Sequence, residues 1–183
     1  MSDSDAADDW RVVDSEAEYE TPWYTGGYDL VEQPDGTTKK YYWAELPDAV
    51  VVVARDSDDL LFVDQYRPVI RAQCLELPAG IVEDGESYEA AAARELREET
   101  GFVPDETVLL QRAEAATGVL RHERGFVVAT GLTEVGRELD TNEFLSVERV
   151  PVEEAVAVAR EQPANDATLE GVLLAKEAGL LRP

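Results

Sequence analysis

The sequence predicts a mixed α/β (α+β) fold, in which a mixed β-sheet lies between helices as an α/β/α sandwich and follows a small antiparallel sheet. Strand patterns and helical patterns are interspersed from residue 48 onward. All three tryptophans and five of the seven tyrosines lie between residues 10 and 43, and aromatic residues favour strands. We therefore expect an acidic disordered tail at residues 1–9, an antiparallel sheet at residues 10–47 and the main domain at residues 48–183.

Composition and charge indicate a globular protein with a strongly acidic surface. The chain has 183 residues, with 40 acidic against 16 basic side chains, a net charge of -24 and a hydrophobic share of 44%. Charge of this sign repels nucleic acid and anionic membranes, so neither is expected as a partner. No apolar run reaches the roughly 18 residues that span a bilayer, and the N-terminus is acidic where a leader would be basic. A cytoplasmic location is therefore expected.

The acidic excess also predicts how the protein responds to salt. Only three of the basic residues are lysines, and removing residues 1–9 takes away only four carboxylates. Charge of one sign destabilises the compact state by self-repulsion unless salt screens it. The composition resembles that of proteins from salt-loving organisms. The alternative is an ordinary acidic protein with an acidic tail.

Turn residues and apolar runs predict the strands. The residues Pro34-Asp35-Gly36 predict a hairpin turn within the N-terminal sheet. Residues 56–59 are a second turn, which follows a valine run of the buried-strand type. Cys74 is expected to be a small buried hydrophobe because no catalytic partner lies nearby in the sequence. The expected strands are residues 28–33, 37–43, 49–54, 60–65, 74–77, 107–115, 126–131 and 144–150.

Capping residues predict three helices. Ser87 is a good N-cap for a helix over residues 88–99, and Gly101 suits the position after its C-terminus. Two closing helices are expected, one starting near Pro151 as its first residue and one near Asn165 or Asp166 as its cap. The last helix is expected to bury an apolar stripe formed by Leu169, Val172, Leu173 and Leu180.

Three glutamates predict a divalent-cation site on the helix at residues 88–99. At 100° per residue, Glu95, Glu98 and Glu99 lie within an arc of roughly 100°. Like charges so close together destabilise a helix, and hard divalent cations such as Mg²⁺ or Mn²⁺ offset that repulsion through oxygen ligands. In so acidic a protein, the alternative is a solvated acidic helix face.

The spacing around these glutamates is that of a known motif. Gly80 is followed after five residues by Glu86, and after seven more by Arg94-Glu95-Leu96-Arg97-Glu98-Glu99-Thr100-Gly101-Phe102. A chance match at every defined position has a probability on the order of 10⁻⁶ for this composition. The chain therefore resembles the Nudix hydrolases, whose fold is a mixed sheet between helices.

The resemblance implies metal-dependent hydrolysis of a nucleoside diphosphate linked to another group. It implies that Glu95, Glu98 and Glu99, with the Ala79 carbonyl, hold Mg²⁺ or Mn²⁺, and that Glu98 takes part in catalysis. Arg94 would orient the glutamates, while Gly80 and Glu86 would support the loop. A catalytically silent module that senses ADP-ribose is an alternative, although such a module has no need of the costly carboxylate cluster.

The flanking residues resemble the ADP-ribose pyrophosphatase branch of this family. They are Gln65-Tyr66-Arg67-Pro68, Leu75-Glu76-Leu77-Pro78-Ala79-Gly80 and Asp166-Ala167-Thr168. This branch implies ADP-ribose as substrate, AMP and ribose 5-phosphate as products, and a homodimer in which the N-terminal sheet covers the partner's site. The residues expected to contact substrate are Arg67, Glu76, Tyr28 and Trp23. A structural ion pair for Arg67, and packing for any one aromatic including Tyr24, are the alternatives. NADH, dinucleoside polyphosphates, nucleotide sugars and oxidised nucleotides remain open as substrates.

One segment departs from the branch pattern. Residues 116–125 place Thr117 where relatives have proline, and ungapped alignment places His122 at the position of the water-activating glutamate. One inserted residue restores Glu123 to that position. Glu123 is the expected general base, and His122, the single histidine, is one alternative because neutral imidazole can accept a proton. The other alternative is an exposed loop in which neither residue is catalytic.

Overall fold

The computed structural model describes residues 10–137 and 144–181, so the tail expected at residues 1–9 lies outside the described part. The chain forms two compact units. The N-terminal unit contains the residues up to Pro47 together with Glu114–Glu123, and the main unit contains Asp48–Ala113 with the residues from Arg124 onward. In the described residues, no helix is both long and apolar enough to cross a membrane.

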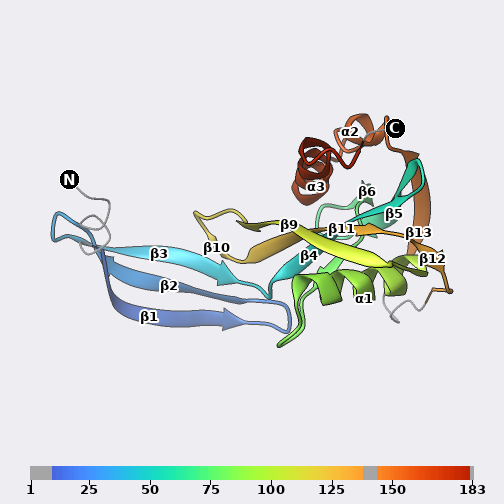
Figure 1. Ribbon diagram of the computed structural model, residues 1–183. Helices are drawn as coiled ribbons and strands as arrows, with labels where there is room; N and C mark the ends of the chain where they lie inside the picture. Colours follow the sequence, from blue (N-terminus) through green and yellow to red (C-terminus); the bar gives the residue numbers. More distant parts are fainter. Residues whose placement is uncertain (1–9, 138–143, 182–183) are drawn as a thin grey trace. The chain divides into compact units, whose positions relative to one another are not determined.

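A four-stranded sheet forms the N-terminal unit (Figure 1). The first three strands are antiparallel neighbours, which confirms the predicted N-terminal sheet. The fourth strand, which the sequence did not predict, is short and lies parallel to the third. In sheet order the strands are β1 (Arg11–Glu20), β2 (Thr25–Glu32), β3 (Thr38–Glu45) and β10 (Leu120–Arg121).

The predicted hairpin turn joins β2 to β3. Gly36 adopts a positive φ of 80°, which glycine accepts without strain, and its N–H donates to the Gln33 carbonyl at 2.9 Å. The Asp35 carboxylate accepts from the hydroxyl of Thr37 at 2.6 Å and from its N–H at 2.9 Å. These hydrogen bonds lower the pKa of Asp35. The turn chemistry read from the sequence is therefore confirmed.

A seven-stranded sheet forms the centre of the main unit. β4 runs parallel to β11 and antiparallel to β5, so the sheet is mixed as predicted. A separate two-stranded sheet pairs β8 (Phe102–Val103) with β12 (Thr133–Glu134). The strands of the large sheet are β4 (Ala49–Asp56), β5 (Asp59–Arg67), β6 (Ala72–Glu76), β7 (Ala79–Ile81), β9 (Glu106–Glu114), β11 (Glu123–Thr130) and β13 (Leu145–Pro151).

Helices cover both faces of this sheet (Figure 1). Alternate residues of β4 enter two different cores, because side chains along a strand point to opposite faces. Val51 and Val53 pack with α2 (Ala155–Val158) and α3 (Asp166–Glu177), whereas Val50 and Val52 pack with α1 (Tyr88–Thr100). The predicted α/β/α sandwich is therefore confirmed.

The helix boundaries follow the predicted caps. The Ser87 hydroxyl accepts from the N–H of Ala90 at 3.2 Å, and Gly101 ends α1 with a φ of 80°. The Asn165 side chain accepts from the N–H of Thr168 at 3.1 Å and so caps α3. These contacts are local in sequence, which is why the sequence predicted them.

Two details of the closing helices were wrong. Pro151 is the last residue of β13, opposite Asp59 of β5, so sheet pairing overrides its preference for a helix start. The helix after it begins only at Ala155 and has four residues. Leu180 follows the end of α3, where its N–H donates to the Ala175 carbonyl at 2.9 Å, and Leu173 is 39% exposed. Neither leucine therefore belongs to a buried stripe of the helix.

Candidate active site

The strand–loop segment before α1 is fixed on the main sheet and on α3. The N–H of Leu77 donates to the buried Thr168 hydroxyl at 3.0 Å, and the Pro78 carbonyl accepts from the N–H of Val52 at 2.8 Å. Gly80 then pairs with Val50 in β4. Because both ends of this segment are bound to the core, the loop has a defined position against α1.

Arg94 lies at the centre of the glutamate cluster. Its Nη1 donates to Glu95 Oε1 at 2.8 Å and to Glu98 Oε2 at 3.1 Å. Its Nη2 donates to Glu86 Oε2 at 3.0 Å and to the Ile81 carbonyl at 2.7 Å. One guanidinium therefore connects the loop to two predicted metal ligands, which is the arrangement expected for an orienting arginine.

Carboxylates outnumber cations in this cluster. Glu95 is 8% exposed and Glu99 is 4% exposed. The hydrogen bonds from Arg94 lower the pKa of Glu86, and the same contacts raise the pKa of Arg94. Burying carboxylates is costly unless cations compensate their charge. A hard divalent cation bound through oxygen ligands suits this donor set.

The backbone of Gly80 leaves room for the Glu95 carboxylate. A Cβ atom at Gly80 would lie 2.0 Å from Cδ and Oε1 of Glu95. The N–H of Ala79, next to it, donates to Glu99 Oε2 at 3.1 Å. Among residues 10–137 and 144–181, no three acidic, histidine or cysteine side chains already converge as a formed metal site. The donor set nevertheless fits Mg²⁺ or Mn²⁺ in its chemistry, because carboxylate and carbonyl oxygens are the ligands these cations prefer.

Replacing Gly80 by alanine is expected to abolish most activity with little change in thermal stability. The added methyl group displaces the end of a flexible side chain, so the fold accommodates it, but the Glu95 carboxylate loses its place. The measurement is kcat together with Tm. Gly26→Ala is the matched control, because its Cβ would meet its nearest neighbour at 3.8 Å, an ordinary contact. Full activity of Gly80→Ala would contradict the assignment of Glu95.

Arg67 and Glu76 form a second cluster in the main unit. Arg67 Nη2 lies 2.6 Å from Glu76 Oε2, and Gln65 donates to the same oxygen at 3.1 Å. Asn165 donates to the other oxygen, Oε1, at 2.5 Å. The sequence suggested Asn165 only as a helix cap. No local signal could reveal its contact with Glu76, because the two residues are 89 positions apart.

The Glu76 carboxylate borders a cavity of about 290 Å³. Asn165 and Asp166, at the start of α3, also line it. Burial would raise the pKa of Asp166, but an ion pair with Arg124 at 2.9 Å outweighs it and lowers that pKa. Cys74 lines the same cavity, and burial raises the pKa of its thiol. Cys74 therefore behaves as the small buried hydrophobe expected from the sequence.

The aromatic candidates lie in the N-terminal unit and differ in exposure. Trp23 is 74% exposed, whereas Tyr28 is buried. The Tyr28 hydroxyl donates to Glu16, and the Lys40 ammonium lies 3.5 Å from the centre of its ring. These contacts favour a packing role for Tyr28 and leave Trp23 accessible to a ligand.

His122 and Glu123 also belong to the N-terminal unit. His122 is buried, and its Nδ1 lies 2.8 Å from the Pro47 carbonyl. A carbonyl only accepts, so Nδ1 carries the proton and this ring atom is used in a structural contact. Glu123 begins β11 as a partly buried residue. The contact of His122 with Pro47 leaves Nε2 as the unprotonated ring nitrogen, so both Glu123 and His122 stay candidates for the base.

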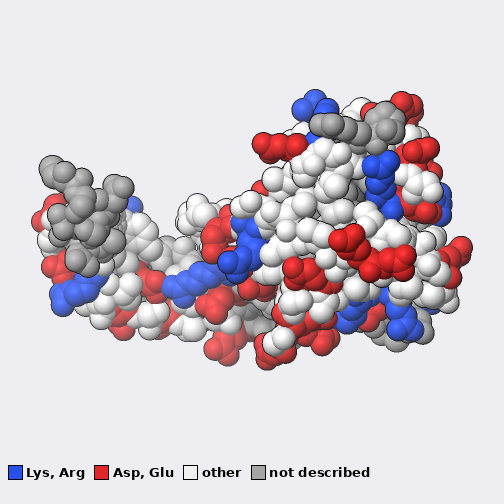
Figure 2. Space-filling view, in the orientation of Figure 1, with Lys and Arg blue, Asp and Glu red and all other residues white. Residues whose placement is uncertain are grey.

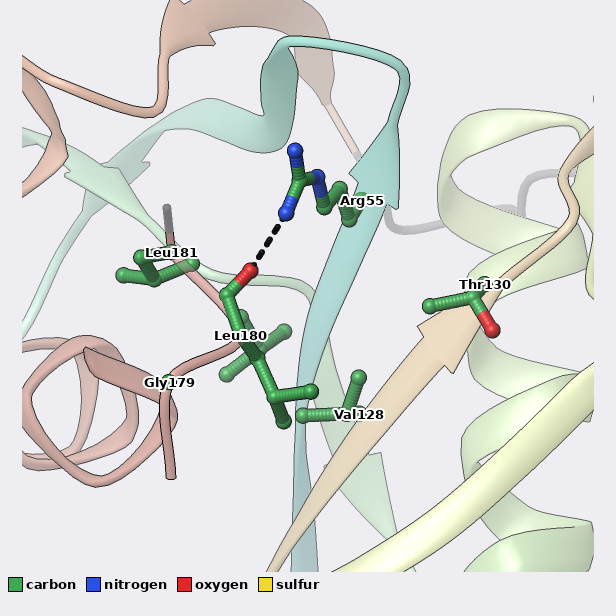
Figure 3. Close-up of a pocket in the computed structure, with 7 residues that line it drawn as sticks. Arg55, Val128, Thr130, Gly179, Leu180 and Leu181 are labelled. Carbon is green, nitrogen blue, oxygen red and sulfur yellow. Dashed lines mark hydrogen bonds between the residues drawn. The ribbon is translucent and has the colours of Figure 1, made fainter. Parts of the chain in front are cut away.

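A further cavity lies beneath the C-terminal segment and contains none of the predicted site residues (Figure 3). Its volume is about 160 Å³, and Val53 and Val128 from the sheet and Leu180 and Leu181 from the C-terminal segment contribute to its lining. Arg55 Nη1 donates to the Leu180 carbonyl at 2.6 Å, which ties this segment to β4. The geometry assigns Arg55 a structural role.

The fold and the Arg94-centred cluster define a class of α/β/α proteins with a glutamate-rich loop and helix. The family model described as NUDIX domain matches residues 45–172, which is more than half of the chain. The chain therefore belongs to the Nudix family, and it is a Nudix hydrolase.

Relatives and a solved structure agree with this family. An ADP-ribose pyrophosphatase of Bacillus subtilis is 33% identical over 140 residues, covering 75% of this chain and 76% of the relative. An ADP-ribose pyrophosphatase of Mycobacterium tuberculosis is 32% identical over 173 residues, covering 92% and 84%. The crystal structure of an ADP compounds hydrolase superimposes with a TM-score of 0.84 at 24% identity, covering 92% of this chain and 93% of that one. The structural likeness supports the fold.

Proposed function

We propose that this hydrolase cleaves the pyrophosphate bond of ADP-ribose, giving AMP and ribose 5-phosphate, in a reaction that requires a divalent cation. The observation that carries the proposal is the cluster in which Arg94 holds Glu86, Glu95 and Glu98. The substrate is supported by the flanking residues around Arg67 and Glu76, and by relatives that carry the name ADP-ribose pyrophosphatase. Other nucleoside diphosphate derivatives are the competing substrates.

In the main unit, different residues would bind the cation, orient its ligands and contact the substrate. Glu95, Glu98, Glu99 and the Ala79 carbonyl would hold Mg²⁺ or Mn²⁺, which neutralises pyrophosphate charge and acidifies a water molecule when bound. Arg94 keeps the carboxylates oriented and Glu86 keeps the loop on Arg94. Arg67 donates to a phosphate or ribose oxygen of the substrate in exchange for part of its pairing with Glu76.

The proton of the attacking water goes to Glu123. The water oxygen forms a bond to phosphorus, the bridging P–O bond breaks, and the leaving phosphate departs with the bridging oxygen. The accessible Trp23 stacks on the adenine, since an exposed indole offers a flat apolar face.

A panel of substrates tests the proposed substrate. Purified full-length protein with Mg²⁺ is given ADP-ribose, NADH, diadenosine polyphosphates, nucleotide sugars and oxidised nucleotides, and kcat/KM is measured for each. ADP-ribose should give the highest value. A value at least tenfold higher for another member would replace ADP-ribose as the substrate and leave the reaction type intact.

We also propose a homodimer that uses the N-terminal sheet. All ten residues of β1 are exposed in a single chain, and exposed aromatic side chains lie on the same sheet or directly before its strands. They are Trp10, Tyr19, Tyr24, Tyr41 and Tyr42. An aromatic sheet of this size gains stability by packing against a second copy. Light scattering in molar KCl should give twice the mass of the chain. A monomer, both without and with ADP-ribose, would contradict the dimer.

Thermal stability is expected to rise steeply from low to molar KCl. Figure 2 shows acidic side chains spread over the visible face, in keeping with the net charge of -24. At molar salt the Debye length falls to about 3 Å, which removes most of the repulsion between them. Tm measured against KCl concentration, with a chelator present so that metal binding does not contribute, tests this. A flat curve would refute the halophilic adaptation. The cytoplasmic location and the absence of nucleic-acid and membrane partners stay predictions of the sequence.

A further inference from the structure

The Glu76 carboxylate is held through both of its oxygens. Arg67 Nε donates to Oε2 at 2.8 Å, Arg67 Nη2 lies 2.6 Å from the same oxygen, and Gln65 donates to it at 3.1 Å. The other oxygen, Oε1, accepts from Asn165 Nδ2 at 2.5 Å. Glu76 is only 3% exposed, so these donors replace the water that a carboxylate otherwise requires. The orientation of this carboxylate therefore depends on Asn165 as well as on Arg67.

Asn165 uses both ends of its side-chain amide. Its Oδ1 accepts from the N–H of Thr168 and caps α3, while its Nδ2 donates to Glu76. A planar amide offers an acceptor and a donor at once, whereas an ionised aspartate, which caps a helix equally well, offers acceptors alone. The contact with Glu76 thus requires an amide at this position, which capping alone does not.

The start of α3 is fixed to the end of β6. The buried hydroxyl of Thr168 accepts from the N–H of Leu77, the residue after β6, at 3.0 Å. Two residues later, the N–H of Ala79 donates to the Glu99 carboxylate at 3.1 Å. All of these residues belong to the main unit. Asn165 therefore acts from a fixed helix start, and it acts on the segment that leads directly to the glutamate cluster.

We infer that Asn165 is a positioning residue: by holding Oε1 of Glu76 it keeps Oε2 turned toward Arg67, and so presents the guanidinium to a phosphate group of the substrate. This inference rests on the proposed role of Arg67 as a substrate contact. The Arg67 side chain is 44% exposed, so its guanidinium is accessible to a ligand while Glu76 holds it. Without Asn165, the carboxylate is free to turn about its last side-chain bond, and the guanidinium loses its fixed direction. A side chain that is already ordered loses less entropy when it binds phosphate, and the substrate is then bound more tightly.

A double-mutant cycle in KM tests this role. Asn165→Ser is made in the wild-type chain and in the Arg67→Ala chain, and both KM and kcat are measured with Mg²⁺ for the member of the substrate panel that gives the highest kcat/KM. Serine keeps the cap of α3, but its hydroxyl ends one bond closer to the backbone than the amide does. In the wild-type chain, KM should rise about 3-fold to 10-fold while kcat stays within about twofold. In the Arg67→Ala chain, the same change should alter KM by less than about twofold, because the group that it positions is gone.

Leu174→Ala is the matched control for a general loss of helix stability. Leu174 is a partly buried residue of α3 that packs against the core, and its replacement lowers Tm without removing a hydrogen bond to Glu76. Its KM should stay within about twofold of the wild type. Hydrogen exchange at the Nε–H of Arg67, measured by NMR in the free protein, gives a second readout that does not depend on turnover. This exchange should become faster in Asn165→Ser and stay unchanged in Leu174→Ala.

Each outcome decides a different claim. If Arg67→Ala leaves KM unchanged, Arg67 does not contact the substrate, and the positioning role fails while the hydrolase activity stands. If Asn165→Ser raises KM equally in both chains, if Leu174→Ala raises it as much, or if the Nε–H exchange does not change, the inference is overturned and the role of Arg67 stands. If no member of the panel is turned over, the proposed function fails, and the Nε–H exchange alone decides whether Asn165 positions Arg67.

Discussion

Replacing Glu99 by glutamine is expected to lower kcat at least about 10²-fold while the fold stays intact. Glutamine has the same shape, and its amide oxygen can still accept from the N–H of Ala79, which holds the Glu99 carboxylate at 3.1 Å. The negative charge is lost, and with it a cation ligand whose removal should exceed the 10–100-fold cost typical of outer-sphere contacts. Removing one charge from a crowded helix face should also leave the metal-free protein as stable or more stable. Steady-state kinetics over a range of Mg²⁺ and Tm without metal test both parts.

Glu89→Gln is the matched control for this prediction. Glu89 lies in the first turn of the same helix. Its replacement by glutamine removes one negative charge, as Glu99→Gln does, but outside the glutamate cluster. Its kcat should stay within about twofold of the wild type, since surface changes have small effects. A Glu99→Gln variant whose kcat is within a few-fold of the wild type would remove Glu99 from the metal site. It would leave the buried carboxylate cluster without a catalytic explanation.

Glu123→Gln is expected to lower kcat by about 10²–10⁴-fold with little change in KM, the usual effect of losing a general base. His122→Ala should cost much less, because the structure shows its imidazole in a buried contact with the Pro47 carbonyl. The remaining loss in His122→Ala should come from poorer order of the segment and should appear as a lower Tm as well as a lower kcat. Both kcat and Tm are therefore measured for the two variants.

The ranking of these two variants decides the assignment of the base. A larger kcat loss in His122→Ala at unchanged Tm would transfer the role to His122. If both variants stay active, either the base lies elsewhere or a metal-activated water needs no protein base. His122→Gln is a useful third variant, because its side-chain amide can donate to the Pro47 carbonyl and separates the structural contact from the chemistry.

Local signals explain what the sequence predicted correctly. The glutamate motif lies on one loop and one helix, and the family resemblance carried by its spacing implied that Arg94 orients the glutamates, which agrees with its contacts to Glu95 and Glu98. The caps at Ser87 and Asn165 act within three residues. Such contacts join residues close together in the sequence, so they can be predicted without knowing the fold.

Contacts between distant segments explain what the sequence did not predict. Asn165 reaches Glu76 across 89 positions, and Arg121 reaches Asp29 across 92. The short strand β10 has no pattern of its own, because its pairing with β3 defines it. Pro151 was misread for the same reason, since its pairing with β5 is a tertiary effect. Such contacts become visible only once the fold is known.

The most direct test of the proposed activity is phosphate release from ADP-ribose by the full-length protein in molar KCl, coupled to a salt-tolerant phosphatase that acts on the products but not on intact ADP-ribose. The account predicts rapid release with Mg²⁺ or Mn²⁺, none with a chelator, and restoration when the cation is added back. Release that continues unchanged in the chelator would contradict the role given to Glu95, Glu98 and Glu99. No release with either cation would contradict hydrolysis of ADP-ribose itself.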